Sequence, residues 1–166
     1  MTIDELLAVL EMQEEILQFT HFTNEDAWEL GSAMTLEARR RRFPVLISIR
    51  LNNGFTVFQY AADGANLQNE GWIQRKFQTV RTLEHSTLYT CMLLKKSEET
   101  LENWFLDPRE YAACGGGFPI RVEEVGVIGA VMVSGLDHFS DHDFIIKSVS
   151  RYLHVDEVPR IQGSIR

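Results

Sequence analysis

The densest group of chemically versatile residues runs from Cys114 to Asp143 and reads CGGGFPIRVEEVGVIGAVMVSGLDHFSDHD. Near its start are three consecutive glycines, Gly115–Gly117, whose backbone amides are free to curl into an anion-binding nest. The segment lacks the Lys-Ser/Thr pair of a phosphate-binding loop, and no GxGxxG pattern follows a strand. The same glycines fit a helix C-cap with a tight entry into a strand. Both interpretations, a backbone-lined ligand pocket and a simple chain reversal, stay open.

The end of this segment, DHFSDHD, offers a second kind of chemistry. His138 and His142 are four residues apart with three aspartates around them, and all five are conceivable metal ligands. Ser140 followed by Asp143 is also a capping pattern that begins a helix. If the helix begins there, His138 precedes it and the four-residue spacing does not align the two imidazoles. A capped helix start is therefore favoured, and no metal site is predicted.

Nucleophilic catalysis has one candidate in Cys114, whose thiol adjoins the glycine amides and would use His85 or His142 as its base. Ser134 precedes Gly135 but lacks the G-x-S-x-G elbow. A buried thiol is the favoured interpretation of Cys114. The chain has two cysteines and no CxxC pair, as expected of reduced thiols in a cytosolic protein.

Trp72, Arg75 and Lys76 form the main polar and aromatic group outside that segment. On a helix Trp72 and Lys76 lie one turn apart, so the ammonium can stack on the indole as a cation–π pair. The same three side chains could hold an acidic or planar ligand. Structural or interface use is favoured, and ligand binding remains the alternative.

Helical periodicity marks the elements that must position these residues. Residues 2–19 begin with the capping-box pair Thr2 and Glu5. Residues 24–42 are expected to start at an Asn24 cap and to end before Pro44. Further helices are expected over residues 69–96 with a break near His85–Ser86, over residues 97–106, and from Ser140 onward.

Strand patterns come in two pairs. Residues 45–51 and 55–61 flank Asn52-Asn53-Gly54, which predicts a type I′ hairpin. Residues 118–122 and 125–133 form the second pair, and the last of these is apolar on both faces, as a central strand requires. Two hairpins imply an antiparallel sheet whose central strand needs cover on both sides. The predicted class is α+β, three-layer, with helices flanking the sheet.

Composition limits the possible functions. The 166 residues, 45% of them hydrophobic, suffice for one domain over 1–166. A net charge of −8 argues against nucleic-acid binding, and the basic run Arg39–Arg42 suits a helix C-terminus better than a specific anion site. No apolar run spans a bilayer and the acidic N-terminus is not a signal peptide, so a cytoplasmic location is expected. Residues 154–166 lack periodicity and are expected to form a loose or partner-bound tail.

Three segments, GWIQRKFQTVRTLEHST, CGGGFPIRV and GVIGAVMVSGLDHFSDHDFII, together resemble a known family. The combination is similar to the haem-degrading-domain superfamily of GlcG/HbpS-like proteins, in a branch of small uncharacterised conserved proteins that includes a yeast member. The resemblance covers roughly residues 20–155. It implies a profilin-like antiparallel sheet flanked by helices, and a homo-oligomer that is a dimer or a ring of dimers.

The resemblance also implies two kinds of function. Some superfamily members bind or degrade haem, whereas the yeast relative is associated with delivery of tail-anchored membrane proteins. This chain has no CxxCH motif, and His85 and His142 are its candidate axial ligands for haem. The other positions carried over by the resemblance are Trp72, Arg75, Lys76, Gly115, Gly116, Gly117, Phe118, Pro119 and Asp141.

Two hypotheses follow. In the first, the protein is a small-ligand-binding domain for haem or another small anionic ligand. The glycine run and the Asp141–His142 helix start would face Trp72 across a pocket, with Arg75 and Lys76 holding a carboxylate. In the second, it is a non-enzymatic oligomeric scaffold or adaptor linked to chaperone-type protein delivery, with residues 27–43 in subunit contacts. Whether the protein is an enzyme is left open.

Overall fold

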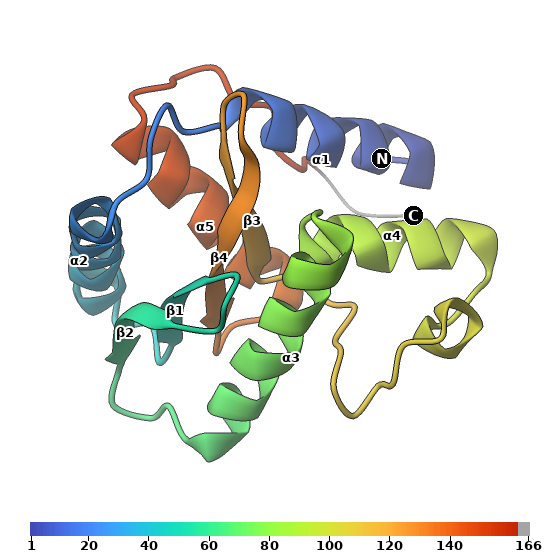
Figure 1. Ribbon diagram of the computed structural model, residues 1–166, viewed down its shortest axis with the longest axis horizontal. Coiled ribbons are helices and arrows are strands. Elements are labelled where there is room, and N and C mark those ends of the chain that lie inside the picture. Colours follow the sequence, from blue (N-terminus) through green and yellow to red (C-terminus); the bar gives the residue numbers. More distant parts are fainter. Residues whose placement is uncertain (163–166) are drawn as a thin grey trace.

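The computed structural model describes residues 1–162, in which five α-helices surround a four-stranded sheet (Figure 1). Within these residues, no helix combines the length and the apolar character needed to cross a membrane. In chain order the elements are α1 (Ile3–Ile16), α2 (Asn24–Arg41), β1 (Leu46–Leu51), β2 (Thr56–Ala61), α3 (Leu67–Leu83), α4 (Thr87–Ser97), the 3-10 helix η1 (Leu101–Trp104), β3 (Gly117–Val122), β4 (Gly126–Ser134) and α5 (His138–Tyr152).

The sheet is antiparallel throughout and has the strand order β2-β1-β4-β3. At its centre Val131 of β4 pairs with Ile49 of β1 on one side and with Phe118 of β3 on the other. The strand predicted to be central is therefore central, because its apolar side chains on both faces need cover. The predicted α+β class is confirmed.

Helices cover both faces of the sheet and produce three layers. On one face, α2 and α5 pack over Ile47, Ile49 and Val131. On the other face, Ile73 and Phe77 of α3 pack over a smaller apolar cluster of the inner strands. At the end of the sheet, α1 and α4 pack against each other through Leu6, Leu7, Leu10, Leu88 and Met92. Successive side chains of β1 point to opposite faces of the sheet, so Ile47 and Ile49 belong to the first cluster and Leu46 belongs to the second.

The β1–β2 hairpin is real, but the prediction of a type I′ turn is wrong. The Gly54 amide donates to the Leu51 carbonyl at 2.8 Å, and Gly54 has a φ of 92°. A type I′ turn needs positive φ at Asn52 and Asn53, and in the described chain neither has it. The loop is the three-residue kind, in which glycine alone takes the left-handed position.

Two helix boundaries also differ from the prediction. α5 begins at His138 rather than beyond Ser140, because Asp137 is the N-cap and its carboxylate accepts the Ser140 amide at 3.0 Å. His138 is thus the first residue of the helix and not a residue before it. The helix expected over residues 97–106 is reduced to the single turn of η1, which follows a left-handed Glu98 at the end of α4.

The segment after α5 has no helix or strand through residue 162, as its lack of periodicity predicted. It is not loose over this range, because it packs back on its own chain. The Pro159 carbonyl accepts from Gln13 Nε2 at 2.9 Å, and Arg160 forms two hydrogen bonds with the Asp143 carboxylate. The rest of the predicted tail, residues 163–166, lies outside the described residues.

Candidate functional site

Lys76 of α3 and Asp141 of α5 form a buried ion pair beside the end of β4. Lys76 Nζ lies 3.3 Å from Asp141 Oδ2 and donates to the Val133 carbonyl at 2.8 Å. Each side chain is only 3% exposed. The two residues were expected on opposite sides of one pocket, and the fold brings them into direct contact instead. We refer to Lys76, Asp141, Gly116 and the Val133 carbonyl as the buried junction.

Asp141 also fixes the loop that precedes α5. Its Oδ1 accepts the Leu136 amide at 2.9 Å, while Oδ2 faces Lys76. Burial raises the pKa of Asp141 to about 6, against the opposing pull of the Lys76 ammonium and of the hydrogen bonds. A carboxylate in this position depends on its partner, so the pair ties α3, β4 and α5 together.

The glycine run is enclosed by these same elements. A Cβ atom on Gly116 would lie 2.5 Å from both Lys76 Nζ and the Val133 carbonyl oxygen, and Gly116 has a φ of 119°. A Cβ on Gly115 would lie 2.2 Å from the His138 carbonyl oxygen. The Gly115 amide already donates to His138 Nδ1 at 3.1 Å. Close packing therefore accounts for these glycines, and a ligand-binding role for them stays a prediction.

Gly117 and Phe118 begin β3 within the same packed region. The Gly117 amide donates to Thr87 Oγ1 at 2.9 Å, so it too has a protein partner. The Phe118 ring is 1% exposed and meets the imidazole of His142 edge-on, with centroids 6.3 Å apart. In this conformation both residues serve the core between β3, α4 and α5.

Trp72 stacks with Arg75 rather than with Lys76. The Arg75 guanidinium lies 4.1 Å from the centre of the Trp72 ring, and Arg75 Nε donates to the Gly71 carbonyl at 3.2 Å. The predicted Trp72–Lys76 stack is wrong, because Lys76 turns inward to Asp141. The group that looked like one cluster in sequence thus divides between a partly exposed cation–π pair and the buried junction.

His142 is fully buried between α5 and α1. Its Nε2 donates to Gln13 Oε1 at 2.7 Å, while its Nδ1 has no hydrogen-bond partner within residues 1–162. Burial lowers the pKa of His142 to about 4, so the ring is neutral at physiological pH. An axial-ligand role for His142 would require this packing to open.

His85, the other candidate axial ligand, lies in the loop between α3 and α4. Its Nδ1 is 3.2 Å from Glu14, whose hydrogen bond raises the pKa of the imidazole, and its ring stacks on Tyr89. It lines a shallow, strongly acidic groove of about 350 Å³ with Glu11, Glu14, Glu15, Gln18 and Arg121. The two histidines contact consecutive residues of α1, Gln13 and Glu14, but His142 is fully buried and His85 is partly exposed.

Cys114, the candidate nucleophile, is a partly buried free thiol. Burial raises the pKa of the Cys114 thiol, which disfavours the thiolate that a nucleophile needs. Across residues 1–162, no group of three or more His, Cys, Asp or Glu side chains is placed to hold a metal ion.

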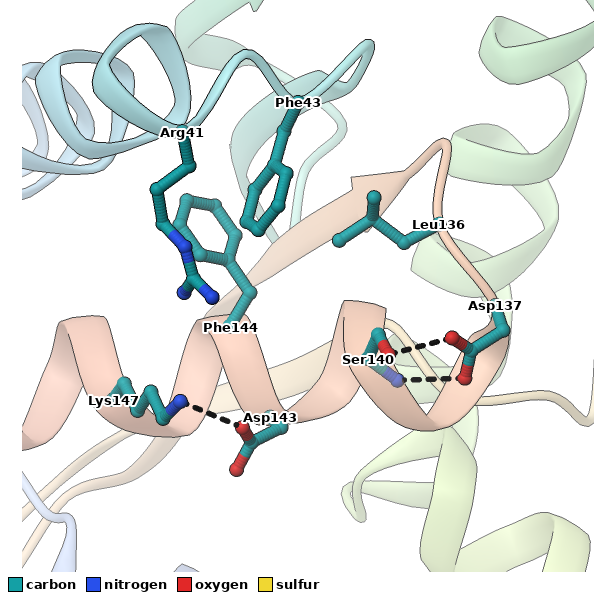
Figure 2. A pocket seen from close by; sticks show the side chains of 8 residues that line it. All are labelled: Arg41, Phe43, Leu136, Asp137, Ser140, Asp143, Phe144 and Lys147. Atoms are coloured by element: carbon teal, nitrogen blue, oxygen red, sulfur yellow. Dashed lines mark hydrogen bonds and ion pairs between the residues drawn. The ribbon is translucent and has the colours of Figure 1, made fainter.

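A cavity that the sequence interpretation missed opens beside the first turns of α5 (Figure 2). It measures about 290 Å³. Two segments far apart in the chain build it, the end of α2 with the following loop and the β4–α5 loop with α5. We name it the α5 cavity, and its lining residues are Arg41, Phe43, Leu136, Asp137, Ser140, Asp143, Phe144 and Lys147.

The α5 cavity combines an apolar base with positive charge. Phe43 and Phe144 meet edge to face with centroids 5.7 Å apart, and the Arg41 guanidinium lies 4.6 Å from the centre of the Phe43 ring. Figure 2 shows Arg41 extending beside both rings, with Lys147 on the adjacent turns of α5. Among the described residues Arg41 has no ion-pair partner, so its charge is available to a ligand.

Both carboxylates of the α5 cavity are already engaged. Asp137 accepts from the amide and the hydroxyl of Ser140 as the helix cap. Asp143 accepts two hydrogen bonds from Arg160 and lies 3.3 Å from Lys147 Nζ. Arg160 thus offsets the charge of Asp143, which would otherwise repel an anion.

Comparison with known proteins places this arrangement in a family. Residues 22–150 match the family described as haem degrading protein HbpS-like. The chain belongs to the HbpS-like haem-degrading family. Within it, an uncharacterised UPF0303 protein of Edwardsiella ictaluri is 38% identical over 158 residues, covering 95% of this chain and 100% of that protein. A UPF0303 protein of Yersinia enterocolitica is 34% identical over 154 residues, covering 92% and 91%.

Solved structures agree with this HbpS-like assignment. The crystal structure of the Ybr137w protein matches with a TM-score of 0.82 and 32% identity, over 89% of this chain and 87% of that one. HbpS itself matches with a TM-score of 0.64 and 23% identity, over 82% and 92%. A PduOC–haem complex matches with a TM-score of 0.66 and 19% identity, over 78% and 93%. The last two likenesses concern the fold alone.

The segment shared with the HbpS-like family contains both the buried junction and the α5 cavity. Two sequence signals marked the ends of the cavity, the basic run around Arg41 and the DHFSDHD segment. Each has a sufficient local explanation as a helix end or a helix start, and nothing in the local pattern indicates that they face each other. The apolar residues that join them, Phe43 and Phe144, have no distinctive spacing.

Proposed function

We propose that this protein is a binding domain for a planar anionic ligand of the tetrapyrrole class, held at the α5 cavity. The observation that supports this is the pairing of two aromatic rings, Phe43 and Phe144, with two cations, Arg41 and Lys147, around one opening. Aromatic rings bury the flat face of a conjugated ligand, and the cations match its carboxylates. The family description, which names haem, makes haemin the first ligand to test.

The chemistry of the lining predicts how such a ligand would be held. Among the described residues that line the α5 cavity, none is a histidine, cysteine, methionine or tyrosine, so no axial ligand to iron is expected there. A volume of about 290 Å³ is at the lower limit for ligand pockets. The ligand would therefore insert one edge and leave the rest outside, and its binding would rest on ring contacts and carboxylates rather than on the metal.

Titration with haemin and with iron-free protoporphyrin IX tests this proposal. Both ligands are expected to bind with affinities within a few-fold of each other, followed by the Soret band and by porphyrin fluorescence. Arg41→Ala and Lys147→Ala should each weaken binding by about fivefold to tenfold, as expected for loss of one charge-assisted contact. Arg39→Ala is the matched control, because Arg39 belongs to the same basic run but does not line the cavity.

Two results would overturn the proposal. The first is haemin binding that protoporphyrin IX does not share and that His85→Ala abolishes, which would assign the ligand to the groove beside Glu14. The second is absence of binding for both porphyrins, which would leave the scaffold or adaptor hypothesis standing.

A further inference from the structure

A second opening lies next to the α5 cavity and shares a residue with it. It measures about 280 Å³ and lies between α5 and the segment that follows this helix. Lys147 lines both openings, and Arg160, which lines the second, holds Asp143 of the first through two hydrogen bonds. We name the second opening the basic pocket, because Lys147, Arg151 and Arg160 supply three cations to its wall.

The basic pocket is preformed, because its outer wall is fastened at both ends. After α5 the chain turns back toward α1 (Figure 1). The Val155 amide donates to the Ser150 carbonyl at 2.9 Å, and both Val155 and Val158 pack against the main core. The bond between Arg160 and Asp143 fixes the other end. A ligand would therefore meet these side chains already in place, which lowers the entropic cost of binding.

Positive charge exceeds negative charge around the basic pocket, on a chain whose net charge is −8. Lys147 and Arg160 share one carboxylate, that of Asp143. Of the lining residues within 1–162, Asp156 alone is acidic. This local excess of cations favours an anionic ligand.

Arg151 is the cation of the basic pocket with the weakest protein contact. Its side chain is 73% exposed, and its guanidinium lies 3.9 Å from the carboxylate of Glu37. That carboxylate already accepts two hydrogen bonds from Arg40. The planar guanidinium of Arg151 is therefore available for a bidentate contact with a carboxylate of a ligand.

Helix geometry aligns Arg151 with the aromatic side of the α5 cavity. Phe144 and Arg151 are seven residues apart on α5, which places them within about 20° around the helix axis and roughly 10 Å along it. Lys147 lies between them. The tetrapyrrole proposed above inserts only one edge into the α5 cavity, so its opposite edge would extend along α5 toward Arg151.

We propose that the basic pocket is an anion subsite of the α5 cavity, and that it selects tetrapyrroles with four carboxylates over those with two. This inference rests on the proposed function, because the ligand enters through the α5 cavity. Protoporphyrin IX carries both propionates on one edge, where Arg41 and Lys147 can hold them. Coproporphyrin III carries one propionate on each pyrrole ring, so its outer edge also presents carboxylates to Arg151 and Arg160.

Fluorescence titration with coproporphyrin III, protoporphyrin IX and mesoporphyrin IX tests the subsite. Mesoporphyrin IX has two propionates and no vinyl groups, so it separates the number of carboxylates from the loss of the vinyl groups. The wild type should bind coproporphyrin III about tenfold more tightly than either dicarboxylate. Raising the salt concentration from about 0.05 M to about 0.5 M should reduce this preference, because the additional contacts are exposed to solvent.

Substitution of Arg151 should change the preference itself. Arg151→Ala should reduce the preference for coproporphyrin III to about twofold, and Arg151→Glu should abolish it, because a carboxylate then repels the outer propionates. Arg39→Ala is the matched control, since Arg39 lines neither opening and this variant should keep the tenfold preference. Thermal denaturation checks that the exposed substitutions leave the fold intact.

The subsite is overturned if the three porphyrins bind the wild type equally, or if Arg151→Glu keeps the wild-type preference. Equal binding of all three that Arg41→Ala weakens would remove the subsite alone and leave the proposed function in place. Absence of binding for all three porphyrins would overturn both.

Discussion

Two aspartates in the first two turns of α5 each form an ion pair with a lysine, over the same distance but in very different surroundings. Lys76 and Asp141 are 3.3 Å apart and 3% exposed, whereas Lys147 and Asp143 are 3.3 Å apart and about one-third exposed. The first is part of the buried junction, and the second lies at the α5 cavity. The two pairs have equal distances but unequal effects on stability. Water screens the charges of the exposed pair, whereas each charge of the buried pair depends on the other for compensation.

Removal of the lysine from each pair should affect the stability of the protein very differently at the two sites. Lys76→Ala should lower the free energy of unfolding by about 3–5 kcal/mol at pH 7, because it leaves the Asp141 carboxylate buried and uncompensated. Lys147→Ala should cost less than about 0.5 kcal/mol. Urea denaturation of both variants measures the difference. At pH 5 the cost of Lys76→Ala should shrink, since Asp141 then takes up a proton more readily. Equal costs for the two variants would contradict the distinction.

Two glycines differ in the same way, one in packed and one in open surroundings. Gly116 and Gly126 have nearly the same φ, 119° and 116°, but an added Cβ meets protein atoms at 2.5 Å in the first and nothing within 4 Å in the second. Gly126→Ala should cost about 1 kcal/mol for backbone strain alone, and Gly116→Ala about 3 kcal/mol or more because overlap is added. Thermal denaturation would separate them. If both cost the same, Gly116 serves only the backbone turn.

The pH dependence of stability tests how strongly burial shifts the pKa values of His142 and Asp141 on α5. The pKa of His142 is lowered from 6.5 to about 4. The contribution of this group to the free energy of unfolding is therefore present above pH 6.5 and is lost as the pH falls toward 4. The pKa of Asp141 is raised from 3.8 to about 6. The contribution of this group to the free energy of unfolding is therefore present below pH 3.8 and is lost as the pH rises toward 6. At about 1.4 kcal/mol for each pH unit, the two effects are of similar size, about 3 kcal/mol, and of opposite sign.

The wild type should therefore change little in stability between pH 6 and pH 4. His142→Gln should become more stable on acidification over this range, and Asp141→Asn should become less stable, each by about 2–3 kcal/mol relative to its value at pH 6. Denaturation curves at several pH values measure this. A His142→Gln variant that loses stability in acid would show that the imidazole is not held neutral.

The smallest expected effect concerns the α5 cavity, through the C-terminal segment. Arg160→Ala should weaken porphyrin binding about threefold, because Asp143 then regains its full negative charge beside Lys147. Asp143→Asn should strengthen binding, and the double variant should bind as tightly as Asp143→Asn alone. Fluorescence titration of protoporphyrin IX suffices for the series. Weak binding by the double variant would mean that Arg160 acts through the position of the tail instead.

Much of the fold follows from local pattern. The apolar alternation of residues 45–51 and the two-sided apolar run of β4 predicted an inner pair of strands, and the helical periods predicted most of the helices within a few residues. The errors fell at caps, because Asp137, Ser140 and Asp143 offer competing starts for one helix. The Asn-Asn-Gly turn failed for a related reason: glycine supplies positive φ wherever the loop needs it.

Sequence alone determined which apolar side chains each element must bury, the family, and the α+β class, because periodicity and composition are properties of one continuous segment. Tertiary structure alone decided which elements meet. Lys76 and Asp141 are 65 residues apart in the sequence, and Arg41 and Phe144 are 103 residues apart. Local sequence patterns do not predict such long-range contacts, because an ion pair or a cavity forms only when the packing of separate elements has fixed their relative positions.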